Sequence, residues 1–195
     1  RHGATRANHW FYESWNTNDI SWSPAGDKPI PWMFISFPSL KDPMHDPGPS
    51  KRHTGEAFVW ADWSDVAPFS AGGAETRVDE WLSLRQRVEA KLMAFFSAKF
   101  PALEQFIVHC ELGTPLATAS FTGHEKGGFY GIEATPRRLL SDALSARTPV
   151  PGLFLSGQDV ATPGIAGALL GGMLGAAAIE PRVFQKFKSA LVIGV

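Results

Sequence analysis

The sequence is poor in cysteine and shows no sign of targeting or anchoring. Its 195 residues include one cysteine, Cys110, which excludes an intrachain disulfide and leaves the redox compartment open. The alternating apolar pattern around Cys110 predicts a small core residue rather than a nucleophile. No N-x-S/T sequon, no signal-peptide pattern and no apolar run of about 18 residues occurs. We therefore expect a cytoplasmic or peripheral membrane protein, with no transmembrane span in this chain.

An excess of charge of one sign is also lacking. The chain carries 18 basic and 19 acidic side chains, a net charge of −1, so it offers no electrostatic footprint for nucleic acid. His45 and His53 lie in a proline-rich loop without the spacing of metal ligands, and we expect no metal site. His109 has no partner in a recognisable catalytic triad, so the residues themselves indicate no triad chemistry.

Aromatic residues are abundant instead, with 7 Trp and 14 Phe. Residues 1–28 are dense in them and irregular, and we expect this segment to pack on the core or on a missing N-terminal part. Residues 30–37 and 55–63 predict two strands, and the alternation over 104–112 predicts a third. Short helices are expected at 136–144 and in a tail at 181–195.

A long helix is predicted over residues 76–100. Thr76 and Asp79 resemble a capping box at its start, and Pro101 stops it. Its apolar residues recur at steps of three and four, which predicts one buried stripe: Trp81, Leu84, Val88, Leu92 and Phe95.

The stretch 151–180 organises the rest of the chain. Residues 153–156 predict a short buried strand, Gly157 a sharp turn, and Asp159 leaves that turn as a lone acid. Pro163 and Gly164 open a helix that runs to about residue 179 and ends before a proline. Glycines at 167, 171 and 175 share one face of this helix, and each costs about 1 kcal/mol of helix stability relative to alanine. Either another helix or a flat ligand is therefore expected close to the backbone.

The start of this helix suits a nucleotide cofactor. Unpaired N–H groups and the positive dipole end attract phosphate, and Asp159 can accept hydrogen bonds from hydroxyl groups. The alternative from the pattern alone is a tightly packed core helix that follows a glycine turn.

The run L-F-L-S-G-Q-D-V-A-T-P-G-I-A-G-A-L-L-G-G resembles the C-terminal FAD-binding motif of the phytoene desaturase, carotenoid isomerase and retinol saturase group. These are FAD-dependent oxidoreductases that act on polyenes. The resemblance implies that Asp159 approaches the ribityl and pyrophosphate region of the flavin. It also implies that four residues lie against the cofactor: Gly157, Gly164, Ile165 and Ala166.

Residues 113–135 carry a second resemblance to this family. T-P-L-A-T followed by G-G-F-Y-G is similar to the segment that re-enters the flavin domain, although a glycine-rich connector is the alternative. The resemblance implies that Gly128, Tyr130 and Gly131 line the flavin pocket and that Thr118 faces substrate. Tyr130 is expected to position the ring, because a free phenol with a pKa near 10 is poorly placed for acid–base work; a role as proton donor stays open.

The G-x-G-x-x-G fingerprint of a dinucleotide fold is absent from the sequence. With the resemblance, this implies a C-terminal fragment of a two-domain, glutathione-reductase-like enzyme, α+β to α/β in class, that lacks the N-terminal Rossmann βαβ unit. Residues 1–112 would belong to the substrate-binding domain and residues 113–195 to the FAD-binding domain. FAD would be bound mainly with the missing N-terminal half, which is the expected partner.

The resemblance implies an FAD-dependent oxidoreductase that saturates, desaturates or isomerises a lipophilic polyene, with NAD(P) as an electron partner left open. Such a fragment alone is expected to be inactive. A flavin amine oxidase shares the architecture and is one alternative. A non-catalytic lipid-binding or interaction fragment is another, favoured by the aromatic N-terminal segment and the absent Rossmann half.

Overall fold

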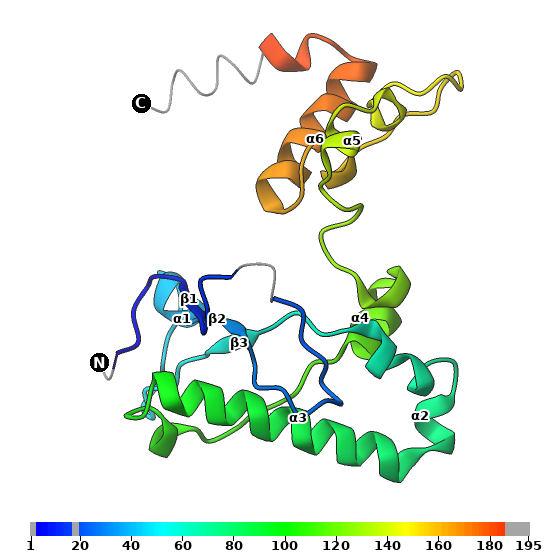
Figure 1. Cartoon of the computed structure of the whole chain (residues 1–195). Helices are drawn as coiled ribbons and strands as arrows, with labels where there is room; N and C mark the ends of the chain where they lie inside the picture. The colour runs from blue at the N-terminus through cyan, green and yellow to red at the C-terminus, as the bar shows by residue number, and fades with distance from the viewer. Residues whose placement is uncertain (1–2, 17–19, 186–195) are drawn as a thin grey trace. The chain divides into compact units, whose positions relative to one another are not determined.

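The computed structural model describes residues 3–16 and 20–185, which fall into two compact units, Arg1–Gly127 and Gly128–Val195 (Figure 1). The first unit is an α+β structure built on one sheet, and the second is built around one helix. Assignment of these units to a glutathione-reductase-like enzyme, with a substrate domain and a flavin domain, stays a prediction. No helix in the described part of the chain is long and apolar enough to cross a membrane.

The first unit contains a three-stranded antiparallel sheet in the order β1-β2-β3. Its strands are β1 (His9–Tyr12), β2 (Trp32–Ser36) and β3 (Glu56–Phe58). The strand predicted at 30–37 is confirmed, and all five residues of β2 are buried, as suits a central strand. The strand predicted over 55–63 is shorter than expected. Residues 1–28 were expected to be irregular, so β1 was missed. All four residues of its sequence H-W-F-Y carry aromatic rings, so no apolar–polar alternation reveals a period of two.

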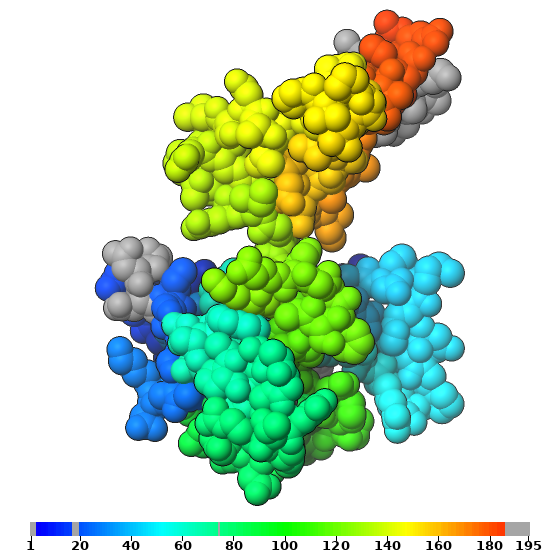
Figure 2. Space-filling model, turned by 90° about the vertical axis from the view of Figure 1, so that its right-hand side faces the viewer, coloured from blue at the N-terminus to red at the C-terminus, as the bar shows by residue number. Residues whose placement is uncertain are grey.

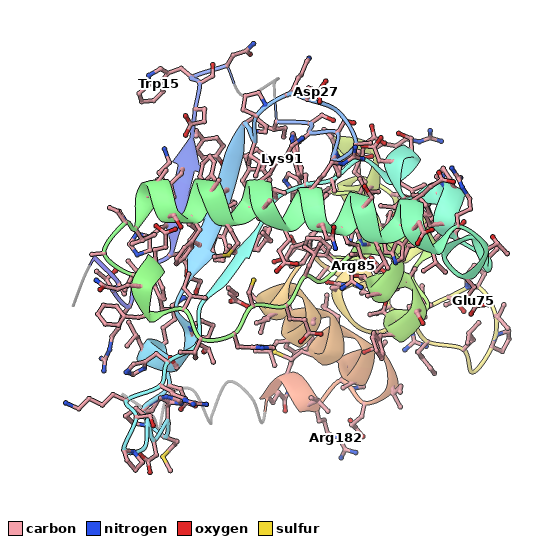
Figure 3. The ribbon with its side chains drawn as sticks, turned by 90° about the horizontal axis from the view of Figure 1, so that it is seen from below. Trp15, Asp27, Glu75, Arg85, Lys91 and Arg182 are labelled. Atoms are coloured by element: carbon pink, nitrogen blue, oxygen red, sulfur yellow. The ribbon has the colours of Figure 1, made fainter. Side chains whose placement is uncertain are left out.

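One face of this sheet forms the core under α3 (Val78–Lys99). Met33, Ile35 and Phe37 pack there with Trp22, Ile30 and Phe100. The predicted apolar stripe of α3 is confirmed: Leu84 is buried, Val88, Leu92 and Phe95 pack against the core, and Trp81 lies beside Phe69. Figure 3 shows α3 crossing the strands. Lys91 of this helix points toward the loop that contains Gly26, and its ammonium group donates to the Gly26 carbonyl.

The capping box at the start of α3 is wrong. The N-cap is Arg77, which makes no side-chain capping bond. Thr76 instead ends a separate short helix, α2 (Gly73–Thr76), and its hydroxyl donates to the carbonyls of Gly72 and Gly73. Because the hydroxyl bonds backward, it is not available to the N–H groups of α3. The predicted stop is confirmed, since α3 ends at Lys99, two residues before Pro101.

The strand predicted at 104–112 is wrong. A 3-10 turn, Glu104–Phe106, is followed by chain without regular structure, and Val108, His109 and Cys110 are exposed. Alternation alone cannot form a strand, which needs a neighbouring strand to satisfy its backbone. The prediction of Cys110 as a core residue fails with it. Although Cys110 is exposed, neighbouring atoms remove part of the water around its thiol, and this desolvation, followed by the Glu89 carboxylate, raises the pKa of the thiol and favours its protonated form.

Several short elements complete the first unit. The segment 113–135, for which a glycine-rich connector was the alternative, holds α4 (Pro115–Thr122). The Thr114 hydroxyl caps this helix by accepting a bond from the Ala117 N–H, and Gly123 ends it at φ 70°. The others are α1 (Pro38–Lys41) and the 3-10 turns Trp63–Asp65, Ala67–Phe69 and Glu125–Gly127. The sequence missed α4 because its cap, Thr114, looks like one more turn residue in a glycine-rich stretch.

The second unit is organised by α6 (Ile165–Ile179), whose bounds are as predicted. Gly164 is its N-cap, and Pro181 lies just beyond its end. The helix predicted at 136–144 is shorter, divided between α5 (Pro136–Leu139) and a 3-10 turn, Asp142–Leu144. The strand predicted at 153–156 is wrong, because a single bridge, between Phe154 and Arg147, is all the pairing that forms there among the residues that the structure describes. The predicted tail beyond residue 185 lies outside the described residues.

The glycine face of α6 is confirmed, and its partner is the chain's own preceding segment. Gly167, Gly171 and Gly175 are the buried residues of this helix. A Cβ at Gly167 would overlap the carbonyl oxygen of Thr162, one at Gly171 would overlap that of Gly157, and one at Gly175 would lie 3.0 Å from that of Leu155. In the space-filling view the orange surface of α6 lies against the yellow surface of the preceding loop (Figure 2). Neither another helix nor a flat ligand is needed to explain this face.

We predict that Gly171→Ala destabilises the second unit and that Gly172→Ala does not. The added Cβ at position 171 meets the Gly157 carbonyl, whereas a Cβ at position 172 meets nothing within 4 Å. Overpacking of this kind costs about 1–3 kcal/mol or more, while alanine in an open helical position gains about 0.5–1 kcal/mol. Denaturant unfolding of the two variants measures the difference. Equal stabilities would contradict the packing described for the glycine face.

Candidate functional site

The candidate site lies in the second unit, where the turn at residues 128–132 meets the turn at 157–164. Tyr130 and Gly131 both have left-handed backbone conformations, with φ 72° and 69°. Gly131 lies so close to Asp159 that a Cβ there would overlap the carboxylate oxygen Oδ1. Two groups of predicted residues, distant in sequence, are therefore in direct contact. This contact requires glycine at position 131.

Asp159 lies in the 3-10 turn Gln158–Val160 and is anchored through one oxygen. Its Oδ1 accepts a hydrogen bond of 2.9 Å from the Ile132 N–H. The same oxygen forms an ion pair with Arg138 Nη2 at 3.4 Å. Within residues 3–16 and 20–185, no donor bonds to Oδ2. The side chain remains 42% exposed. One oxygen thus holds the turn, while the other is available to accept a bond from a ligand.

Arg138 is the residue that the sequence reasoning missed. It lies in α5, is only 7% exposed and donates from Nη1 to the Ile132 carbonyl. Its Nη2 donates to the Gln158 carbonyl at 3.0 Å and to Asp159. A buried guanidinium needs such partners, because an unpaired buried charge is costly. Arg138 therefore ties the two turns together and holds the site's acid in place.

Two glycines flank Asp159 in conformations that other residues rarely adopt. Gly157 has φ 94° and Gly164 has φ 91°. No atom lies within 4 Å of a Cβ built at Gly157, so the side of this residue on which a side chain would lie is open, while its carbonyl packs against Gly171 of α6. At Gly164 the nearest atom to such a Cβ is Cε1 of Tyr130, at 3.8 Å, and the Gly164 N–H donates to Gln158 Oε1 at 3.2 Å. The Tyr130 ring thus lies beside the start of α6.

The start of α6 is open. Its N-cap, Gly164, supplies no side-chain acceptor, and the two following residues, Ile165 and Ala166, are exposed, Ile165 by 92%. The first N–H groups of a helix have no partner within it and carry the positive end of the dipole. Together with the free oxygen of Asp159, this arrangement can accept a ligand that carries both hydroxyl groups and phosphate.

The remaining predicted positions are less informative. Thr118 lies in α4 of the first unit, and its hydroxyl donates to the Thr114 carbonyl at 3.3 Å. Gly128 begins the second unit. His45 and His53 have rings 5.3 Å apart, but each is already bonded, to the Arg52 carbonyl and the Ser39 hydroxyl. Among the described residues, no three His, Cys, Asp or Glu side chains gather as metal ligands would.

Comparison with known proteins identifies similar reductases. The chain is 32% identical over 161 residues to the all-trans-retinol 13,14-reductase of Rattus norvegicus, and 32% identical over 163 residues to that of Macaca fascicularis. It is also 31% identical over 165 residues to the inactive all-trans-retinol 13,14-reductase of Danio rerio. Each match covers 78% of this chain and 26% of the relative. No family model and no solved structure matches the chain.

The chain thus spans about a quarter of the length of the relatives it matches, 26% in each case. The resemblance drawn from the motif around Asp159 and the identities to named reductases point to the same group of proteins. Over 78% of its length this chain is homologous to the all-trans-retinol 13,14-reductases, which confirms its resemblance to the retinol saturase group.

Proposed function

We propose that this chain forms part of an FAD-dependent oxidoreductase that acts on a retinoid-like polyene. The observation that carries the proposal is the homology to all-trans-retinol 13,14-reductases over 78% of the chain. The second unit supports it, because the residues of the FAD-like motif converge on one exposed patch around Asp159. The reaction class that follows is reduction of one carbon–carbon double bond, with two electrons and two protons added to the polyene.

The described residues fit a flavin dinucleotide. Asp159 Oδ2 can accept from a hydroxyl group, the open start of α6 suits phosphate, and the open Cβ side of Gly157 lets a ligand approach the turn. FAD, when bound, supplies the redox chemistry. The protein's own residues orient it: Arg138 and Ile132 fix the carboxylate of Asp159, and Tyr130 borders the start of α6.

We assign the rest of the cofactor site to sequence that the relatives carry outside the match. Dinucleotide folds hold the pyrophosphate at a glycine-rich first βα turn, and this chain has no such motif. The second unit also exposes large apolar side chains at Ile165, Leu169 and Ile179. Exposed apolar patches of this kind usually mark a surface that another part of a protein covers.

A second candidate function is a related protein that keeps the fold without the reaction. One relative, from Danio rerio, is described as an inactive all-trans-retinol 13,14-reductase at 31% identity, close to the 32% of the rat enzyme. Identity at this level therefore does not separate the two candidates, and a measurement of activity does.

We predict that the complete gene product containing this chain, loaded with FAD and given a chemical reductant, converts all-trans-retinol to a product with two more hydrogens. Loss of one conjugated double bond moves the absorption to shorter wavelength, and mass spectrometry of the product measures the added hydrogens. A matching all-trans-retinoic acid reaction tests the requirement for the alcohol. Retention of FAD without any product would favour the inactive candidate.

We predict that Asp159→Ala weakens FAD binding by the complete gene product about tenfold or more, because a hydrogen bond to a charged acceptor contributes about 1.5–3 kcal/mol. Asp159→Asn keeps an acceptor for the Ile132 N–H, so it separates the turn's integrity from the carboxylate's charge. As the control, Asp142→Ala removes another aspartate side chain of the same unit. Flavin retained equally by all variants through dialysis would remove Asp159 from the site.

We predict that the 195-residue chain alone does not hold FAD at one per chain and binds hydrophobic dyes. The missing phosphate turn leaves at best a weak site, and the exposed apolar residues of α6 bind the dye. Co-expression with the region that the relatives carry outside the match should restore soluble, yellow protein. A monodisperse chain with stoichiometric FAD would show that the whole cofactor site lies within these residues.

A further inference from the structure

The sheet of the first unit has a second face, opposite α3, that is lined with aromatic rings. The register places Tyr12 beside Trp32, Trp10 beside Phe34, and Phe58 on the other side of Phe34. The Trp32 ring stacks with Trp10 at 5.8 Å and 19°, and with Tyr12 at 6.2 Å and 22°. Around these stacked rings the others meet edge-on or tilted, for example Phe58 against Trp32 at 89° and Trp60 against Trp32 at 53°. The six rings form a continuous surface, called here the aromatic face: Trp10, Tyr12, Trp32, Phe34, Phe58 and Trp60.

The outer rings of the aromatic face remain open to solvent although they stack on one another. Trp10, Tyr12 and Trp60 are 52%, 51% and 40% exposed, whereas Trp32 beneath them is 2% exposed. Removing large aromatic rings from water is favourable, so a surface of this kind favours an apolar occupant.

One end of the aromatic face is polar. Ser36 follows Phe34 on the same side of β2, and Lys41 Nζ donates to its hydroxyl at 2.6 Å and also to Asn8 Oδ1. An ammonium group has three N–H donors, so one remains for a ligand oxygen. Glu56 is the register partner of Ser36 and brings a negative charge to the same end. Because the two charges oppose each other, this end suits a neutral hydroxyl better than a carboxylate.

The other end of the aromatic face opens into a shallow hollow of about 290 Å³. Its wall is formed by Ile20, Ser21, Trp60, Ala61 and Asp62. Trp60 contacts Trp32, and the Trp32 indole N–H donates to the Ile20 carbonyl, which makes the hollow continuous with the aromatic face. The Asp62 carboxylate is bonded to the Ser64 N–H at 2.9 Å. The hollow therefore offers an apolar wall to a bulky end group.

We propose that the aromatic face binds a linear polyene alcohol in one orientation, with its bulky apolar end in the hollow and its hydroxyl at Lys41. This inference rests on the proposed function and adds to it the place and direction of the substrate. From Trp32 to Ser36 the strand spans ~13 Å, enough for an extended chain of several double bonds. The ligand's conjugated chain lies along Trp10 and Tyr12, and its oxygen accepts the third N–H of Lys41.

The test is equilibrium dialysis of the complete gene product, without reductant, against all-trans-retinol and against a polyene hydrocarbon that lacks the hydroxyl. Lys41→Met should weaken binding of the alcohol about tenfold and leave the hydrocarbon unchanged, since only the alcohol loses a bond to a charged donor. Trp10→Leu should weaken both ligands severalfold. Arg87→Met is the control, because it removes one exposed positive charge from α3, on the opposite side of the sheet.

Equal effects of Lys41→Met on both ligands, or none on either, would overturn the orientation. Unchanged binding of both ligands to Trp10→Leu would show that another part of the protein covers the aromatic face, and would overturn the site. These outcomes are independent of the cofactor. A protein that binds the alcohol as described but holds no FAD overturns the proposed function alone, and one that reduces the alcohol with Lys41→Met unaffected overturns this inference alone.

Discussion

The second unit depends on the close contact between the glycine face of α6 and the segment that precedes it. Three glycines at one face cost the helix about 3 kcal/mol of intrinsic propensity relative to alanine. Packing must offset that cost, and it does so by letting the carbonyls of Gly157 and Thr162 reach the helix surface. Because both carbonyls belong to the turn that carries Asp159, the helix fixes the backbone on each side of the acid. The same contact therefore forms the core of the unit and positions its candidate site.

Arg138 adds the second constraint on this site. Its guanidinium is buried and bridges the carbonyls of Ile132 and Gln158, so the two turns are fixed to each other. The ion pair with Asp159 then settles which carboxylate oxygen serves the fold. A half-exposed acid held at one oxygen by a buried cation keeps a fixed orientation, which suits a ligand that donates from hydroxyl groups. Oδ1 thus serves the fold, and under the proposed function Oδ2 serves the ligand.

The sequence predicts local features well and long-range ones poorly. The bounds of α6, its glycine face and the stop of α3 follow from spacing and from proline, which act within one or two turns of helix. The strand at 104–112 was wrong because a strand requires a partner that alternation cannot supply. β1 was missed because rings occupy both of its faces. Contact between Gly131 and Asp159 was expected only through family resemblance, and the role of Arg138 was not expected at all, since its partner carbonyl at Gln158 lies 20 residues away.

The two faces of the first unit's sheet show how large apolar side chains can serve two different purposes. On the α3 side, Met33 and Ile35 are completely buried, and their contacts stabilise the fold. On the aromatic face, Trp10 and Tyr12 keep about half of their surface in water, and covering ~100 Å² of each is worth ~2.5 kcal/mol. That gain is non-directional and cannot distinguish a polyene alcohol from a hydrocarbon or fix which end lies where. Direction comes from polar groups, and the two ends of this face differ in them: Ser36, Lys41 and Glu56 lie at one end, whereas Ser21 and Asp62 border the hollow at the other. Under the proposed binding mode the ammonium group of Lys41 distinguishes the two ends, and it favours elongated molecules with one hydroxyl end over symmetric ones.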